Sequence, residues 1–214
     1  MPSTNLIQNI HEGLASPGNG ETSLIKGNYE YWHYACDGFN DQGWGCGYRT
    51  LQTISSWVML NYATRAKVSV PTIRNIQETL VLLKDKDVNF VGSREWIGSF
   101  EVCLVLEKLY NIPSKVIHVN IGRTLKNYVH EIKNHFERFR CPIMMGGDKD
   151  CSSKCIIGIH FASDIDNIYL LIVDPHFVGK ALIKENLHNN WVRWHNINEF
   201  LDSSFYNMCL PQVK

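Results

Sequence analysis

One cysteine lies between glycines in the stretch of sequence that carries the most chemical information. Residues 41–49 read DQGWGCGYR, and they place Cys46 where a loop rich in glycine and aromatic residues gives way to a helical pattern. The unpaired N–H groups and partial positive charge of a helix N-terminus stabilise a thiolate, which is the reactive form of cysteine. The same N–H groups can hold a developing oxyanion. The segment therefore predicts a nucleophile with part of its oxyanion hole, and a buried structural thiol is the alternative.

A second segment, much later in the chain, supplies a base and an acid. The apolar run at residues 170–173 is typical of a buried strand, and Asp174, Pro175 and His176 follow it. Residues two apart in an extended chain point to the same side, so Asp174 and His176 would face one direction. The carboxylate can then orient the imidazole, which can take the proton of a thiol. A solvated turn is the plainer interpretation of this tripeptide by itself.

Other histidines and cysteines could compete for a role. His160 with Cys46 and Asp174 would be a chemically possible set, but His160 lies between Ile159 and Phe161, which favours a packed strand residue. The spacing of Cys151 and Cys155, near His160, is tolerable for zinc, yet no matching second pair stands out. We therefore expect no metal site and no cofactor.

The elements that must position these residues are helices first and mostly short strands later. Apolar residues spaced three and four apart predict helices after Gly47, from about Pro71, and over residues 99–109 and 124–139. Short β-type runs occupy residues 114–119, 142–145, 155–162, 169–173 and 191–194, with a hairpin turn at 164–167 and a capping box at 196–199. This order predicts an α+β fold with a mostly antiparallel sheet.

Composition narrows the class of protein. The 214 residues, 44% of them hydrophobic, suffice for one core, and we expect a flexible lead-in over residues 1–25 and one domain over 26–214. Twenty-one basic and 21 acidic residues leave no basic stripe for nucleic acid. Seven cysteines, an odd number, do not form a small disulfide framework, and we see no signal peptide and no membrane-spanning run. We expect a monomer in the reducing cytoplasm.

The combination of these motifs resembles a known family, the proteases specific for the ubiquitin-fold modifier. The DQGWGCGYR segment and the later Asp-Pro-His carry the resemblance, and residues 32–34, 93–98 and 142–148 resemble further landmarks of that family in the same order. The resemblance covers about residues 29–210. It implies a papain-like cysteine protease fold with Cys46 as nucleophile, Asp174 and His176 as its partners, and the Tyr34 hydroxyl completing the oxyanion hole.

The resemblance also implies a substrate. The family cleaves after the C-terminal glycine of its modifier, both in the precursor and in conjugates to lysine. A glycine before the scissile bond suits a narrow slot, and Trp44, Gly45 and Trp96 are candidates to form it. Three alternatives remain open at this point. The first is a protease of the autophagy ubiquitin-like modifiers, whose enzymes share Gly-Trp-Gly-Cys and Asp-Pro-His. The second is a catalytically silent module that binds the modifier, and the third is a zinc-stabilised adaptor, which metal analysis of the purified protein would reveal.

Overall fold

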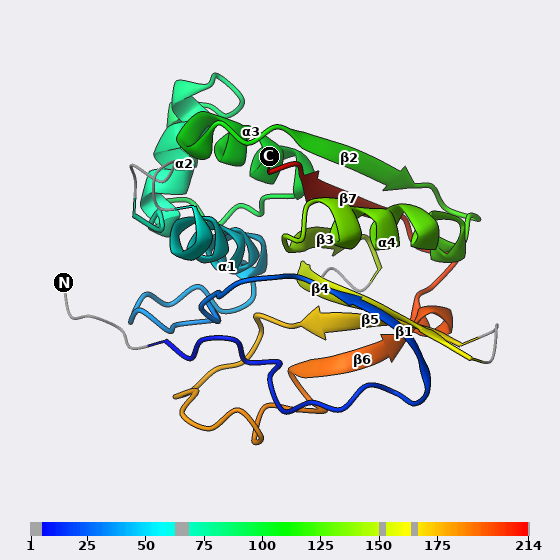
Figure 1. The fold of residues 1–214 in the computed structure, drawn as a ribbon. Helices are drawn as coiled ribbons and strands as arrows, with labels where there is room; N and C mark the ends of the chain where they lie inside the picture. Colours follow the sequence, from blue (N-terminus) through cyan, green and yellow to red (C-terminus); the bar gives the residue numbers. More distant parts are fainter. Residues whose placement is uncertain (1–5, 63–68, 150–152, 164–166, 214) are drawn as a thin grey trace.

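Over the residues that the structure describes, four α-helices and a single antiparallel sheet make up the fold (Figure 1). The structure is a computed structural model that describes residues 6–62, 69–149, 153–163 and 167–213. Within these residues the helices are α1 (Cys46–Asn61), α2 (Ile73–Leu82), α3 (Ser99–Tyr110) and α4 (Val129–Arg138), with 3-10 turns η1 (Val88–Phe90), η2 (Leu125–Tyr128) and η3 (Ile197–Glu199).

The sheet has the spatial order β2-β7-β3-β4-β5-β6, and all of its pairings are antiparallel. Its strands are β1 (Gly20–Leu24), β2 (Ser114–Val119), β3 (Ile143–Gly147), β4 (Lys154–Ala162), β5 (Ile168–Val173), β6 (Val192–Asn196) and β7 (Tyr206–Pro211). Strands β3 and β1 share one edge of β4, because β3 pairs with residues 154–156 and β1 with residues 158–162. The predicted α+β class with a mostly antiparallel sheet is confirmed.

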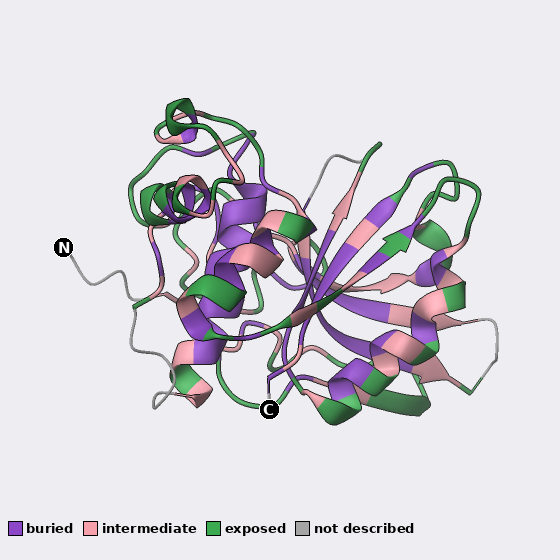
Figure 2. Cartoon of the chain, turned by 90° about the horizontal axis from the view of Figure 1, so that it is seen from above, coloured by how far each residue is buried: buried purple, intermediate pink, exposed green. Residues whose placement is uncertain are grey.

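Helix α1 is the element that carries Cys46, and the core holds it firmly. Its first thirteen residues are all buried, and Leu51, Ile54 and Trp57 belong to the hydrophobic core. The helix packs against β3, β4 and α3, and Figure 2 shows its buried length beside the strands. Burying apolar area stabilises a fold by about 25 cal/mol per Å². The N-terminus of α1 is therefore fixed relative to the beginning of β4.

The prediction of a flexible lead-in is wrong for the described part of residues 1–25. Strand β1 pairs with β4 from Gly20↔Ala162 to Leu24↔Gly158, the Ile25 N–H donates to the Ile157 carbonyl, and the Ile10 side chain is fully buried. The sequence does not predict this strand, because its residues, GETSL, are mostly polar and exposed and show no apolar alternation. Ladder bonds to β4 hold β1 in place, and a solvent-facing strand of this kind can be polar.

Other differences from the sequence-based expectations are smaller. Strand β7 was not predicted, and the helix expected over residues 124–139 begins as the 3-10 turn η2 before α4. The capping box at Asn196 and Glu199 is confirmed, although it begins only η3. Residues 164–166 of the expected hairpin turn lie outside the described residues, while β4 and β5 on either side pair as expected.

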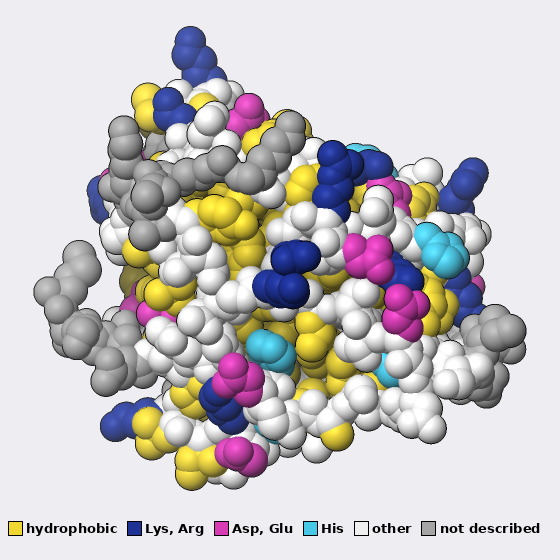
Figure 3. Space-filling view, viewed as in Figure 1, with side chains coloured by type: hydrophobic (Ala, Val, Ile, Leu, Met, Phe, Trp, Pro, Cys, Tyr) yellow, Lys and Arg dark blue, Asp and Glu magenta, His cyan; other side chains and the backbone are white. Residues whose placement is uncertain are grey.

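Charges of both signs are interspersed on the face drawn in Figure 3, with hydrophobic side chains gathered between them. This mixture agrees with the equal numbers of acidic and basic residues in the sequence. In the part of the chain that the structure describes, no helix has the length and apolar character to cross a bilayer.

Candidate active site

Cys46 is the first residue of α1, and the glycines on both sides of it are required by close contacts within the chain. A Cβ atom on Gly45 would lie 2.0 Å from Oδ2 of Asp41, and one on Gly47 would lie 2.4 Å from the Ile97 carbonyl oxygen. Any larger residue at either position would displace one of these neighbours. The two glycines therefore leave the space that Asp41 and Ile97 occupy.

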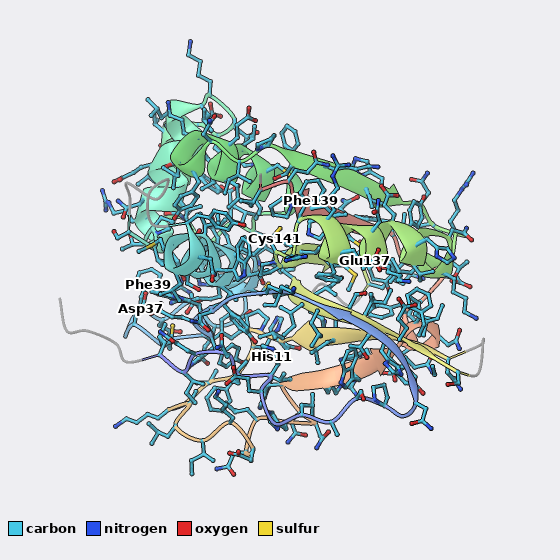
Figure 4. The ribbon with its side chains drawn as sticks, viewed as in Figure 1. His11, Asp37, Phe39, Glu137, Phe139 and Cys141 are labelled. Atoms are coloured by element: carbon cyan, nitrogen blue, oxygen red, sulfur yellow. The ribbon has the colours of Figure 1, made fainter. Side chains whose placement is uncertain are left out.

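A buried arginine attaches the loop before Cys46 to α1. The Arg49 side chain is fully buried, and its Nε and Nη2 lie 2.8 Å from carboxylate oxygens of Asp41 and Asp37 respectively. Asp41 also accepts the Ala35 N–H at 2.9 Å. Figure 4 shows Asp37 on the loop below α1, together with Phe39. Because an unpaired buried charge is strongly unfavourable, this network resists any displacement of the loop that carries Tyr34.

Hydrogen bonds join residues 31–34 to the segment that follows β5. The Tyr31 hydroxyl donates to the Asp174 carbonyl at 2.5 Å, and the Tyr34 N–H donates to the Pro175 carbonyl at 2.9 Å. Nδ1 of His33 lies 3.2 Å from the Phe177 carbonyl, so this nitrogen carries the proton. No motif in the sequence suggests these contacts of Tyr31 and His33. Their contacts align Tyr34 with the Asp-Pro-His turn.

The structure brings Cys46, His176, Asp174 and Tyr34 together from three parts of the chain. Asp174 follows the last residue of β5, and its Oδ1 accepts the backbone N–H of His176 at 2.9 Å and contacts Nδ1 of the same ring. The imidazole also interacts with Cys46, since a hydrogen bond and the charge of Cys46 both raise the pKa of His176. The Tyr34 ring meets the His176 ring edge-on, with centroids 5.1 Å apart.

This arrangement favours a thiolate–imidazolium pair. Burial raises the pKa of the Cys46 thiol, but hydrogen bonds from His176 and Ser153, with the charge of His176, bring that pKa below its ordinary value. Burial lowers the pKa of His176, yet hydrogen bonds and charge interactions with Asp174 and Cys46 raise it to about 9. Burial and the neighbouring Cys46 hold the pKa of Tyr34 well above its usual range, so its hydroxyl stays protonated and can donate.

A second Cys–His contact in the protein lacks this chemistry. The Cys141 sulfur lies 3.3 Å from Nε2 of His135, at the end of α4 where Figure 4 labels Cys141. Burial raises the pKa of Cys141 well above its usual range and lowers that of His135 to about 4, so both groups are neutral. The Cys141 thiol donates to the Pro211 carbonyl at 2.9 Å. Proximity alone therefore does not activate a cysteine in this fold; the Asp174 carboxylate makes the difference at His176.

His160 and the possible zinc ligands lie apart from this site. His160 pairs with Tyr169 across β4 and β5, five residues and roughly 16 Å of strand from Asp174, and its Nδ1 contacts the Thr22 hydroxyl at 2.7 Å. It is a packed strand histidine, as its sequence neighbours indicated. Cys151 lies outside the described residues, and within those that are described no three metal-ligating side chains gather.

A cavity of about 210 Å³ opens beside Cys46. Its lining includes Trp96, Gly98, Gly146, Gly147 and Ser153. Trp96 is 56% exposed at this cavity, whereas Trp44 is 7% exposed and packs edge-on against Phe39 and Tyr48. Of the three slot candidates, Trp96 therefore lines the cavity, while Trp44 and Gly45 do not line it and Trp44 lies in the core. Ser153 had no signal in the sequence, since it precedes β4 without any recognisable motif.

Two larger hollows, each of about 360 Å³, lie elsewhere on the protein. One is lined by residues of α2 and α3, and the other by Cys36, Lys180 and their neighbours. Neither is lined by Cys46 or His176. The smaller cavity is therefore the best candidate of the three for an active site, because it alone is lined by a cysteine whose pKa is lowered.

Comparison with known proteins gives a consistent result. The family model for peptidase family C78 matches residues 20–209. The chain is 40% identical over 207 residues to the probable Ufm1-specific protease 1 of Drosophila melanogaster and 40% identical over 209 residues to the Ufm1-specific protease 2 of Mus musculus. It is similar in structure to a crystal structure of UfSP from C. elegans, with a TM-score of 0.84 and 34% sequence identity over 98% of the chain.

The relatives differ in length. The alignments cover 96% of the present chain in both cases, but 86% of the fruit-fly protein and only 44% of the mouse protein. A probable Ufm1-specific protease of Oryza sativa is 39% identical over 98% of the chain, which corresponds to 33% of the rice protein. The chain thus spans less than half the length of the mouse and rice relatives that it matches.

Proposed function

The chain belongs to peptidase family C78, and on that premise we propose that it is a thiol protease that cleaves after the C-terminal glycine of Ufm1, the ubiquitin-fold modifier. It would act on the Ufm1 precursor and on Ufm1 joined to lysine. The observation that carries this proposal is the contact of Cys46 with His176, and of His176 with Asp174, in a chain that is 40% identical to Ufm1-specific proteases.

The proposed reaction begins at the Cys46 thiolate, which attacks the carbonyl carbon of the modifier's last glycine. The C–N bond breaks, the imidazolium of His176 gives its proton to the leaving amine, and a thioester remains on Cys46. His176 then takes a proton from water, whose oxygen attacks the thioester carbon. The C–S bond breaks, the modifier leaves with a free carboxyl group, and Cys46 returns to a thiolate beside the imidazolium. Asp174 keeps the imidazole oriented and stabilises its charged form through both steps.

The carbonyl oxygen becomes negative in the transition state, and two kinds of donor face it in this proposal. One is the set of N–H groups in the first turn of α1, which have no partner within the helix. The other is the Tyr34 hydroxyl, whose pKa is raised by burial and by its interactions with Cys46, so that it keeps its proton. Preorganised donors of this kind are effective because the protein need not reorganise as charge develops.

The cavity fits a glycine before the scissile bond. Gly98, Gly146 and Gly147 line it with backbone, and Trp96 lies at its exposed side. A chain without side chains can approach Cys46 there, whereas a larger residue would meet Trp96. We propose that Trp96 and these glycines select the end of the modifier.

The proposed function can be tested by incubating the purified protein with Ufm1 precursor and with Ufm1 linked through an isopeptide bond to a lysine peptide. An autophagy modifier precursor serves as the matched control. We expect both Ufm1 substrates to be cut after glycine and the control to survive. Cleavage of the control alone would favour the autophagy alternative, and binding of Ufm1 without cleavage would favour a silent module.

The pH dependence of cleavage follows from the two pKa shifts. We expect kcat/KM to rise with pH through the pKa of Cys46, which lies below its ordinary value, and to fall through the pKa of His176 near 9, where the imidazolium loses its proton. Asp174→Asn removes a charge that raises the pKa of His176, so the alkaline limb moves to lower pH. Its kcat falls on the order of 10²-fold or more. An alkaline limb unchanged in this variant would contradict the role of Asp174.

Tyr34→Phe tests the oxyanion donor separately. The ring and its edge-on contact with His176 are kept, so we expect an unchanged melting temperature and KM, while kcat falls by about 10²–10³-fold. Tyr128→Phe is the control, since the Tyr128 hydroxyl donates to the His118 carbonyl away from the site. In steady-state kinetics, kcat should be low for Tyr34→Phe and near the parent value for Tyr128→Phe. Equal kcat values in the two variants would show that Tyr34 is not the oxyanion donor.

A further inference from the structure

Two cysteines outside the active site lie with their sulfur atoms in contact. The sulfurs of Cys103 and Cys209 are 3.0 Å apart, and both thiols are free. Cys103 lies on α3 and Cys209 on β7, two elements that pack against each other. A disulfide bond needs about 2.05 Å between its sulfurs, so the pair must close by only about 1 Å.

The two thiols have different environments, which suit the two roles in disulfide formation. Cys103 is partly exposed, and the hydrogen bond from Cys209 lowers its pKa despite its burial. Cys209 is fully buried, and its hydrogen bond to Cys103 together with burial raises its pKa well above the usual range. Cys103 is therefore the more exposed thiol of the pair and the one that ionises more readily, and Cys209 is a thiol already in contact with it.

We propose that Cys103 and Cys209 form a reversible disulfide when the protein meets hydrogen peroxide. The Cys103 thiolate attacks one peroxide oxygen, an S–O bond forms, the O–O bond breaks, and the departing hydroxide takes a proton to become water. The Cys209 sulfur then attacks the sulfenic sulfur, an S–S bond forms, the S–O bond breaks, and the hydroxide leaves with the Cys209 proton as a second water. Two thiols lose two electrons in all, and one peroxide gains them.

The bond would join two walls of the active-site cavity. Ser99 lies one helical turn before Cys103, Asn207 lies two residues before Cys209, and both line the cavity beside Cys46. The Ser99 hydroxyl already donates to the Asn207 carbonyl at 2.8 Å. Because the two sulfurs are already in contact, we expect the disulfide to hold α3 and β7, and with them Ser99 and Asn207, in their present positions.

The test treats the full chain, in a Cys46→Ser background that removes the active-site thiol, with one equivalent of hydrogen peroxide. Free thiols are then alkylated, and the protein is digested without reduction. We expect one cross-linked peptide pair containing Cys103 and Cys209, 2 Da lighter than the two thiol peptides. The melting temperature should rise by roughly 5–15 °C and return on treatment with dithiothreitol.

Two further variants show whether the cross-link and the thermal shift depend on Cys103. Cys103→Ser, at the partly exposed position, should abolish both the cross-link and the thermal shift, whereas Cys36→Ser, at another partly exposed cysteine, should leave both unchanged. Recovery of both peptides alkylated, of Cys103 as a sulfinic acid without a cross-link, or of a cross-link to any other cysteine would overturn the proposal.

Discussion

Cys46→Ser is expected to abolish cleavage of Ufm1 substrates, with a loss on the order of 10⁴-fold or more in kcat, and to retain binding. A serine hydroxyl cannot form the charged nucleophile that His176 stabilises in Cys46, because an alcohol is far less acidic than a thiol. The side chain is 6% exposed and contributes little to the surface, so the modifier meets the same face in both proteins. Single-turnover cleavage and calorimetric titration with mature Ufm1 measure the two quantities.

Cys103→Ser is the matched control for this variant, because it removes a partly exposed thiol from α3 and leaves the Cys46 contacts in place. Under reducing conditions it should cleave within a few-fold of the parent rate. Loss of Ufm1 binding in Cys46→Ser, with a lowered melting temperature, would instead show that Cys46 is a structural thiol.

His176→Ala should be far more damaging to cleavage than His160→Ala. In the proposed mechanism the first change removes the group that accepts and returns the proton, so we expect kcat to fall on the order of 10³–10⁴-fold. The second removes a buried histidine whose contacts are to Thr22, Tyr169 and Trp194, so its effect falls on stability rather than on the chemistry. Rates per folded molecule, measured well below both melting temperatures, separate the two effects.

Equal losses in the two histidine variants would reopen the set Cys46, His160 and Asp174. The structure gives no support for that outcome, since His160 pairs near the far end of β5 from Asp174. His176→Gln tests whether the loss in His176→Ala comes from the missing volume, because glutamine keeps much of the side chain but has no group that titrates near neutral pH.

The sequence predicted those elements whose own residues carry a strong pattern. Helix α1 and strand β5 are examples, because one has a buried stripe and the other a continuous apolar run. Strands β1 and β7 have no such pattern: GETSL is polar, and YNMCLP mixes asparagine and proline with apolar residues. Pairing with neighbours distant in sequence makes them strands, and no local window contains those neighbours.

The residues of the candidate site likewise fall into those that a local motif predicts and those that only distant contacts reveal. Cys46, Asp174 and His176 belong to short motifs, so their types and spacing suggested chemistry without a structure. Ser153 and Tyr31 act through contacts with residues more than 100 positions away, which no motif records. Trp44 shows the opposite case: an aromatic residue beside the nucleophile suggested a substrate slot, but its ring lies in the core against Tyr48.

Covalent labelling with Ufm1 whose C-terminal glycine carries a thiol-reactive group tests the proposed nucleophile and substrate together. We expect one adduct, mapped by peptide mass spectrometry to Cys46, absent in Cys46→Ser and absent with the equivalent autophagy-modifier probe. Labelling of another cysteine, labelling by the autophagy probe in place of Ufm1, or binding of the Ufm1 probe without any adduct would contradict the proposed function.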